Sequence, residues 1–351
     1  MGLPLLSRVK NGVVECLACR RCCRIAEGQA GFCGVRCNDK GKLKLQVYGK
    51  PAAVWVDPVE KKPLFHFIPG SATFSLGTFG CNFACSFCQN WDLSQSPQLL
   101  RKRDAKRWRE HFEKLVAQCE SLSPEAVVEK AVATGCKSIA FTYNEPAIFA
   151  EYALDVMKLA RKRGLKGVFV TNGFETRECW NALEGLIDAV NIDLKAFNES
   201  FYARLCKAPD GLEGVKDSIA FAHEKGFWTE VTTLLVPGRN DSLQEMRAAA
   251  EWLASVDESI PWHVTAFHPD YELLDAPPTP VETLLKAREL GLQAGLKFVY
   301  CGNIPGNDFE NTFCPACRKL LVERKGFSVL GNNVVGGKCG FCNATVAGVW
   351  Q

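Results

Sequence analysis

The chain has 351 residues, 47% of them hydrophobic, so it can bury a large core; one barrel-sized domain with small appendages fits this length better than two equal domains. A formal net charge of +3 with 23% charged residues indicates neither a nucleic-acid partner nor an acidic, solvating tail. The sequence contains no long apolar run and no signal-peptide pattern, so we expect no membrane span and a cytoplasmic location.

Cysteine usage is the unusual feature of the composition, with 18 cysteines in the chain. Thirteen of them fall into three groups, at residues 16–37, 81–88 and 314–342, and five are scattered singly. In a chain with no export signal, cysteines grouped at short spacings are typical of metal ligands rather than disulfides. The sequence therefore predicts several metal centres.

The predicted elements, in chain order, begin with a cysteine-rich N-terminal module, residues 1–70, which ends in short strands within LKLQVYG and AAVWVDP. Apolar strand-like runs then alternate with amphipathic helical stretches across residues 71–305. The strands are expected near Thr73, Ser138, Gly167, Ala189, Thr229, His263 and Lys297. The helices between them are expected at 124–135, 146–164, 176–186, 212–226, 242–256 and 281–295. A second cysteine-rich module occupies residues 306–351.

The fold class follows from this alternation. The strands are continuous apolar runs, which is typical of parallel strands buried on both faces. Polar or turn residues follow each strand at once, where the loops of a parallel barrel carry its chemistry. We therefore predict a full or partial (β/α) parallel barrel. These residues are Gly80-Cys81, Asn144-Glu145-Pro146, Asn172-Gly173, Asp193-Leu194-Lys195, Pro237-Gly238, His268-Pro269 and Gly302-Asn303.

The segment GCNFACSFCQN, residues 80–90, is called the cluster loop here. It places Cys81, Cys85 and Cys88 just after the first barrel strand, at spacings of three and then two residues. Three thiolates on one short loop can hold three irons of a [4Fe-4S] cluster and leave the fourth iron open, as a catalytic metal needs. The alternative is a structural zinc or iron site with a fourth ligand from elsewhere.

The cluster loop resembles the signature of the radical S-adenosylmethionine (SAM) superfamily, C-x3-C-x-aromatic-C, with Phe87 as the aromatic residue. The resemblance covers roughly residues 70–305. It implies that S-adenosylmethionine chelates the open iron and that one electron cleaves it, giving a 5′-deoxyadenosyl radical that abstracts hydrogen from a substrate. The whole chain is similar to the radical enzyme of the AmmeMemoRadiSam system, related to the glycyl-radical-enzyme (pyruvate formate-lyase) activases.

The resemblance also implies contacts with S-adenosylmethionine at matched motifs. Glu145 would accept from the amino group, although Tyr143-Asn144 stands where the activases have Gly-Gly, and Val170 replaces an acidic residue before Thr171-Asn172-Gly173. Asp193 and Lys195 would bind the ribose and the carboxylate, and His268 would lie near the adenosine. The full set of implied cofactor-binding residues is Phe87, Asn90, Glu145, Asn172, Asp193, Lys195 and His268.

The two flanking modules each offer four cysteines. The C-terminal cysteine set (Cys314, Cys317, Cys339 and Cys342) forms two C-x2-C knuckles, which predict a closed tetrahedral site for zinc or rubredoxin-type iron. The N-terminal cysteine set (Cys16, Cys19, Cys23 and Cys33) is preferred over Cys22 and Cys37 because of its spacing and glycine turns. Zinc and an auxiliary cluster are both compatible with it, but only a cluster could pass electrons onward.

Two other features stay ambiguous in the sequence. The basic stretch from Arg101 to Leu115 suits a solvated helix, with docking of an acidic partner or lid closure as alternatives. Cys301 ends the last barrel strand and is expected to be a buried small side chain, with hydrogen donation to a substrate as the alternative.

Three functions compete on these features. The first is a radical SAM enzyme acting on a small molecule or cofactor precursor, with a reductase, flavodoxin or ferredoxin as electron donor. The second is an activase that installs a glycyl radical on a partner protein. The third is a non-catalytic electron-transfer or metal-scaffold protein, which would need neither an open three-cysteine site nor the residues matched to S-adenosylmethionine.

Overall fold

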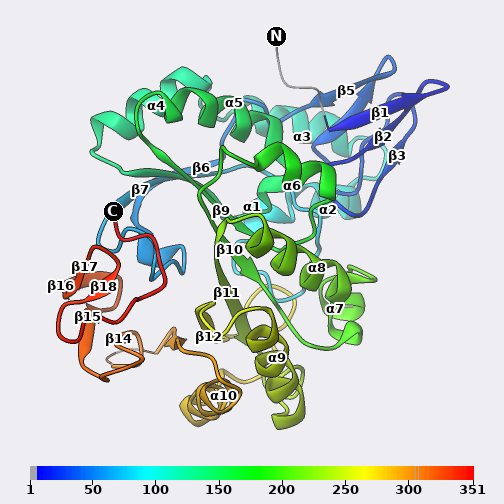
Figure 1. The fold of residues 1–351 in the computed structure, drawn as a ribbon. Coiled ribbons are helices and arrows are strands. Elements are labelled where there is room, and N and C mark those ends of the chain that lie inside the picture. The colour runs from blue at the N-terminus through cyan, green and yellow to red at the C-terminus, as the bar shows by residue number, and fades with distance from the viewer. Residues whose placement is uncertain (1–5, 305, 307) are drawn as a thin grey trace. The chain divides into compact units, whose positions relative to one another are not determined.

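The computed structural model describes residues 6–304, 306 and 308–351 (Figure 1). The chain forms two compact units. Unit 1 comprises Met1–Asp57, Ala72–Asp188 and Cys206–Ala208, and unit 2 comprises Pro58–Ser71, Ala189–Leu205 and Pro209–Gln351. Residues 1–5, used in expecting no signal peptide, and Pro305, at a predicted module boundary, lie outside the described residues. The division into three modules stays a prediction.

Unit 1 contains parallel strands that neighbour one another in chain order. β7 (Ala72–Gly77), β8 (Ser138–Phe141) and β9 (Lys166–Thr171) pair in parallel, and β6 (Ala53–Pro58) neighbours β7. All four residues of β8 are buried. This burial explains why the strands are runs of apolar residues rather than polar–apolar alternations.

Two helices of unit 1, α4 and α6, begin where side chains cap them. Ser123 and Thr176 accept the backbone N–H groups of Ala126 and Cys179, which fixes the first turns of α4 and α6. The expected basic helix is divided in two, because Asp104 accepts the N–H groups of two following residues and forms a turn. The helices are α1 (Trp91–Ser94), α2 (Ser96–Arg103), α3 (Trp108–Ala117), α4 (Pro124–Ala133), η2 (Pro146–Phe149), α5 (Ala150–Arg161) and α6 (Arg177–Leu183).

The N-terminal part of unit 1 is built from short antiparallel strands. β1 (Ser7–Lys10), β2 (Val13–Cys16) and β3 (Arg24–Ile25) form one sheet, and β4 (Arg36–Asp39) pairs with β5 (Lys42–Leu45). Such short strands cannot bury a core of their own, so this segment depends on side-chain contacts with the rest of unit 1.

Unit 2 repeats the parallel pattern. β10 (Ala189–Asp193), β11 (Trp228–Leu235), β12 (Trp262–Ala266) and β13 (Val299–Gly302) pair in parallel in chain order. The helices around them are η1 (Val59–Lys61), α7 (Glu199–Leu205), α8 (Gly211–Glu224), α9 (Leu243–Val256) and α10 (Val281–Gln293). The predicted α/β fold class is confirmed, and the order of strands and helices fits a partial barrel.

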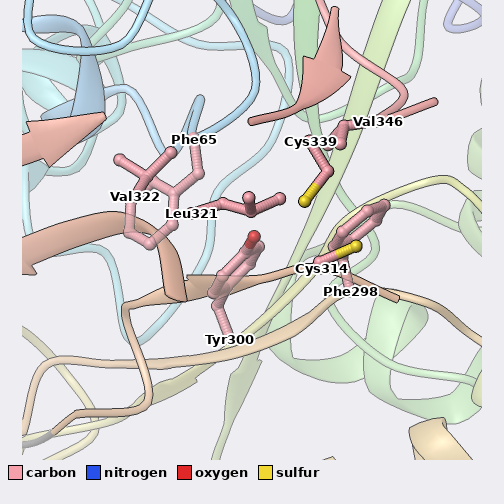
Figure 2. Close-up of a cluster of buried hydrophobic side chains, with 8 residues drawn as sticks. All are labelled: Phe65, Phe298, Tyr300, Cys314, Leu321, Val322, Cys339 and Val346. Atoms are coloured by element: carbon pink, nitrogen blue, oxygen red, sulfur yellow. The ribbon is translucent and has the colours of Figure 1, made fainter. Parts of the chain in front are cut away.

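The C-terminal part of unit 2 is a small β module. Its strands are β14 (Thr312–Phe313), β15 (Leu320–Lys325), β16 (Ser328–Asn332), β17 (Val334–Val335) and β18 (Lys338–Cys339). Leu321, Val322 and Val346 of this module pack in one buried cluster with Phe65, Phe298 and Tyr300, and with two of the C-terminal cysteines (Figure 2). The module therefore shares a core with strand β13 instead of forming one alone.

Across the described residues, none of the helices has the length and apolar character needed to cross a membrane.

Candidate iron–sulfur and metal centres

The cluster loop follows β7 in unit 1, at the position predicted from the sequence. Gly80 has a φ of +91°, and a Cβ there would lie 2.6 Å from the carbonyl oxygen of Cys33, so this position requires glycine. Cys81 and Cys85 are buried and Cys88 is half-buried. The Cys81 sulfur accepts the backbone N–H of Phe83 at 3.4 Å, as thiolate ligands of metals do.

The electrostatics of the loop suit a cationic cluster. Burial raises the pKa of the Cys81 thiol well above its ordinary value, and the Glu145 carboxylate adds to the shift. Cys85 and Cys88 are neighbouring groups that raise the pKa of Cys81 further. Buried thiolates that repel one another require a compensating positive charge, and iron supplies it. The donor set therefore fits an iron–sulfur cluster.

Asn172 lies at the cluster loop. Its Nδ2 donates to Oδ1 of Asn82 at 2.7 Å and lies 3.9 Å from the Cys81 sulfur. The backbone of Asn82 is held by Arg21, whose Nε donates to its carbonyl oxygen. These two contacts hold the residue that follows the first cysteine.

The loop after β8 is joined to the cluster loop by two asparagines. Asn90 donates to the carbonyl of Tyr143 at 2.9 Å, and Asn144 donates to the carbonyl of Gly80 at 2.8 Å. Tyr143 has a φ of +70° and its hydroxyl donates to Asp57 at 2.6 Å. The Tyr-Asn pair that departs from the activase pattern therefore has a structural role here.

Glu145 is buried, and its oxygens accept from the backbone of Ala147 and Asn172 and from the hydroxyl of Thr171. The Thr171 hydroxyl also lies 2.5 Å from Glu175, a second buried carboxyl. Burial raises the pKa of Glu145, and the neighbouring Glu175 raises it further. Burial also raises the pKa of Glu175, to about 7. The two carboxyl groups therefore behave as one buried acidic pair.

The remaining matched residues lie in unit 2. Lys195 and Asp193 form an ion pair at 2.8 Å directly after β10, so the structure brings these two together. His268 is exposed after β12, and its Nδ1 lies 3.4 Å from the carbonyl oxygen of Pro269. Phe87 is buried in unit 1. Their roles toward S-adenosylmethionine stay predictions.

Sequence reasoning missed two side chains of unit 1 that contact the predicted site. Arg21 is located within the N-terminal cysteine group, and Glu175 follows the Asn172-Gly173 turn. Arg21 is distant in sequence from its partner Asn82, and Glu175 lies outside any recognised motif. The one available signal was a charged residue among small and apolar neighbours.

Cys301 is completely buried, and its sulfur lies 3.6 Å from the carbonyl of Leu284 in α10. Burial raises the pKa of its thiol to about 12. These contacts match the expected packing role.

The C-terminal cysteine set is assembled in unit 2. Its four sulfurs all lie within 4.8 Å of one another, with separations of 3.7 Å between Cys314 and Cys342 and between Cys317 and Cys339. Four sulfurs at about 2.3 Å from one ion would be about 3.8 Å apart, which is the edge of that tetrahedron. Backbone N–H groups of Cys317 and Phe341 donate to the sulfurs of Cys314 and Cys339. The set could bind a single metal ion.

The chain is similar to several known proteins. The profile of the radical SAM superfamily matches residues 76–253. An uncharacterized protein of Methanocaldococcus jannaschii is 40% identical over 342 residues, covering 97% of this chain and 96% of its own. The pyruvate formate-lyase-activating enzyme of Clostridium pasteurianum is 21% identical over 235 residues, covering 62% and 87%. A domain of the pyruvate-formate lyase-activating enzyme of Bacteroides vulgatus has a TM-score of 0.42 at 19% identity, covering 47% and 99%.

Proposed function

Since the chain belongs to the radical SAM superfamily, we propose that it abstracts hydrogen from a small molecule or cofactor precursor, using S-adenosylmethionine and a [4Fe-4S] cluster at Cys81, Cys85 and Cys88. The observation that carries the proposal is the placement of the three cysteines on one short loop after β7, held at Asn82 by Arg21 and Asn172. When bound, the cluster and S-adenosylmethionine supply a one-electron cleavage that yields a 5′-deoxyadenosyl radical.

The protein's own residues position these groups. In this proposal Asn172 and Arg21 hold the cluster loop through Asn82, so that the three thiolates keep one spacing. Phe87 shields the cluster from water, and Asn90 ties the loop to the segment after β8.

The ligand contacts are assigned by charge. Glu145 accepts from the amino group of S-adenosylmethionine, Lys195 pairs with its carboxylate, and Asp193 accepts from the ribose hydroxyls. His268 contacts the adenine. Glu145 must exchange part of its hydrogen bonding with Thr171 for that role.

The electron is supplied by a one-electron carrier of the flavodoxin or ferredoxin class or by a reductase. We place the enzyme in the cytoplasm, because clusters of thiolates persist in a reducing compartment. The second candidate function is activation of a glycyl-radical protein, and the similarity to a pyruvate formate-lyase-activating enzyme favours it.

The test is anaerobic reconstitution with iron and sulfide, followed by dithionite and S-adenosylmethionine. We expect 5′-deoxyadenosine from the wild type and from Cys119→Ala, a cysteine outside the three groups, and none from Cys85→Ala. Wild-type protein with a verified four-iron cluster that forms no 5′-deoxyadenosine would contradict the proposal.

The two substrate classes are separated by isotope transfer. Perdeuterated cell extract is divided by ultrafiltration, and each fraction is offered to the reconstituted enzyme. Deuterium in 5′-deoxyadenosine from the low-mass fraction supports the first candidate, whereas deuterium from the macromolecular fraction alone supports the activase.

A further inference from the structure

The residues of the N-terminal cysteine set lie together within unit 1. The backbone N–H of Cys16 donates to the carbonyl of Cys23 at 2.9 Å, and the N–H of Phe32, the residue before Cys33, lies 3.5 Å from the Cys23 sulfur. Three of the four are buried and Cys23 is half-buried, so the set lies in the interior.

The two other cysteines of the segment point elsewhere. Cys22 is exposed, and its sulfur lies 3.7 Å from the carbonyl of Cys19, on its own turn. Cys37 follows Arg36 in strand β4, and successive side chains of a strand point to opposite faces, so Cys37 points away from the Cys16 sulfur that Arg36 contacts. Exposure therefore sets Cys22 apart from the four cysteines, and side-chain direction sets Cys37 apart.

Two sulfurs of the set also accept N–H hydrogen bonds, the arrangement by which proteins stabilise metal-bound thiolates. The donors are Arg36 Nε to Cys16 at 3.1 Å and the backbone of Phe32 to Cys23 at 3.5 Å. An ordinary buried thiol needs no such donors, because it is neutral.

The spacing of the sulfurs discriminates between one ion and a cluster. Among the described residues, the C-terminal cysteine set is the group whose ligand atoms all lie within 4.8 Å of one another. The N-terminal cysteine set and the cysteine trio of the cluster loop, both within the described residues, do not form such a close group. Four ligands of one zinc ion must sit at the closer spacing, whereas ligands of a cubane bind different irons at its corners.

The N-terminal cysteine set lies directly beside the cluster loop. The carbonyl oxygen of Cys33 is so near Gly80, the residue before Cys81, that a Cβ there would be 2.6 Å away. Arg21 lies between Cys19 and Cys23 in the chain, and its Nε donates to the carbonyl oxygen of Asn82, the residue after Cys81, so its guanidinium joins the two segments. A cation in this position favours electrons on either group.

From these contacts we propose that the N-terminal cysteine set binds a second [4Fe-4S] cluster, which relays electrons to the cluster of the catalytic loop. The second cluster takes one electron from a flavodoxin- or ferredoxin-class carrier and gives one electron to the central cluster, with no bond made or broken. Four thiolates occupy all four irons, so the cluster is closed to substrate. The relay role rests on the proposed function, but the metal site does not.

The metal site is tested in the full chain carrying Cys81→Ala, Cys85→Ala and Cys88→Ala. After anaerobic reconstitution we expect this triple variant to keep about four irons with the Mössbauer signature of a [4Fe-4S] cluster. Adding Cys19→Ala and Cys33→Ala should remove that iron, whereas adding Cys22→Ala and Cys37→Ala should leave it. Circular dichroism and the metal content of the C-terminal set report whether each variant is folded.

A triple variant that carries zinc at this site, or no metal beyond the C-terminal set, overturns the proposal. The measurement uses the intact N-terminal segment and no S-adenosylmethionine, so it stays informative if the enzyme forms no 5′-deoxyadenosine.

The relay is tested in Cys19→Ala/Cys33→Ala with the central cluster verified by spectroscopy. We expect 5′-deoxyadenosine formation driven by a reduced flavodoxin to fall about tenfold, while formation driven by dithionite changes less than about twofold. Equal losses with both reductants, or no loss with either, contradict the relay.

Discussion

Arg36 shows how one side chain supports the N-terminal segment. It is 1% exposed and donates to both oxygens of Glu151, at 2.6 and 2.7 Å. Its other contacts are the carbonyls of Leu6 and Ile148 and the sulfur of Cys16. Burial opposes ionisation of Glu151, but the guanidinium holds the pKa of that carboxyl below its usual value. The negative charge of Glu151 is therefore compensated by the guanidinium of Arg36.

Arg36→Met should lower the free energy of unfolding by about 3–5 kcal/mol, because it leaves the Glu151 carboxylate buried without a cationic partner. Arg8→Met is the matched control. Its pair with Glu178 is exposed, with side chains 66% and 44% accessible, and should contribute less than about 1 kcal/mol. Urea denaturation of both variants measures the difference. Equal losses in the two variants would contradict the conclusion that Arg36 compensates the buried charge of Glu151.

Gly80→Ala tests the contact between the cluster loop and Cys33. A methyl group there meets a backbone oxygen, so we expect loss of iron from the cluster loop in addition to the strain of a positive φ. Gly135→Ala has a similar φ of +71° with nothing within 4 Å, and should keep its iron. Iron content after reconstitution distinguishes the two; full iron in Gly80→Ala would show that the contact is dispensable.

At the scale of elements, a buried polar network joins strands of unit 2 to the C-terminal module. Glu230 of β11 accepts from the backbone of Phe65 and His66 and pairs with His263 of β12 at 2.7 Å. His66 lies 2.6 Å from the hydroxyl of Tyr300 and 2.7 Å from the carbonyl of Ala347. Figure 2 shows Phe65 and Tyr300 in the apolar cluster beside this network. Polar pairing of this kind fixes the module to the strands in one arrangement.

His66 should make the protein sensitive to acid. Burial lowers its pKa from 6.5 to about 4, so the folded state holds it neutral where an unfolded chain would protonate it. Above pH 6.5 His66 is neutral in both states and does not affect the free energy of unfolding. As the pH drops to 4, protonation of the unfolded chain lowers the free energy of unfolding by about 3 kcal/mol. In His66→Gln this part of the pH dependence should disappear, whereas in His111→Gln, an exposed site, it should remain. An unchanged slope in His66→Gln, measured by denaturation across this range, would contradict the prediction.

At the scale of the whole chain, the parallel strands were predictable because burial on both faces makes each one an apolar run. The same reasoning could not find α7, which is seven residues long, or the N-terminal hairpins, whose strands of two to four residues carry no periodicity. It also expected one basic helix where Asp104 forms a turn. These elements depend on contacts and caps rather than on pattern.

The candidate site was predictable to the extent that its residues are close in sequence. Spacing alone grouped the trio of the cluster loop and the two knuckles of the C-terminal cysteine set. Spacing could not reveal that Arg21 reaches Asn82 or that Glu175 shares Thr171 with Glu145, because chain folding brings these residues together.

Removal of the C-terminal metal should destabilise a defined part of the chain. The thiolates of this set are adjacent to the apolar cluster of Figure 2, so their repulsion without metal should open it. We expect a chelator to increase hydrogen exchange in residues 58–71 and 312–350 and to leave residues 138–171 unchanged. No change in the first two segments would show that the metal is dispensable for folding.

The cluster loop is completed by residues that the ribosome makes much later. Ala84 donates its N–H to the carbonyl of Cys206, and Arg21 reaches the carbonyl of Lys207. A nascent chain that has released Cys88 still lacks both of these anchors. Under the proposed function, iron is inserted into the anchored loop after synthesis of residue 207, and the thiols of the apoprotein carry no metal during translation.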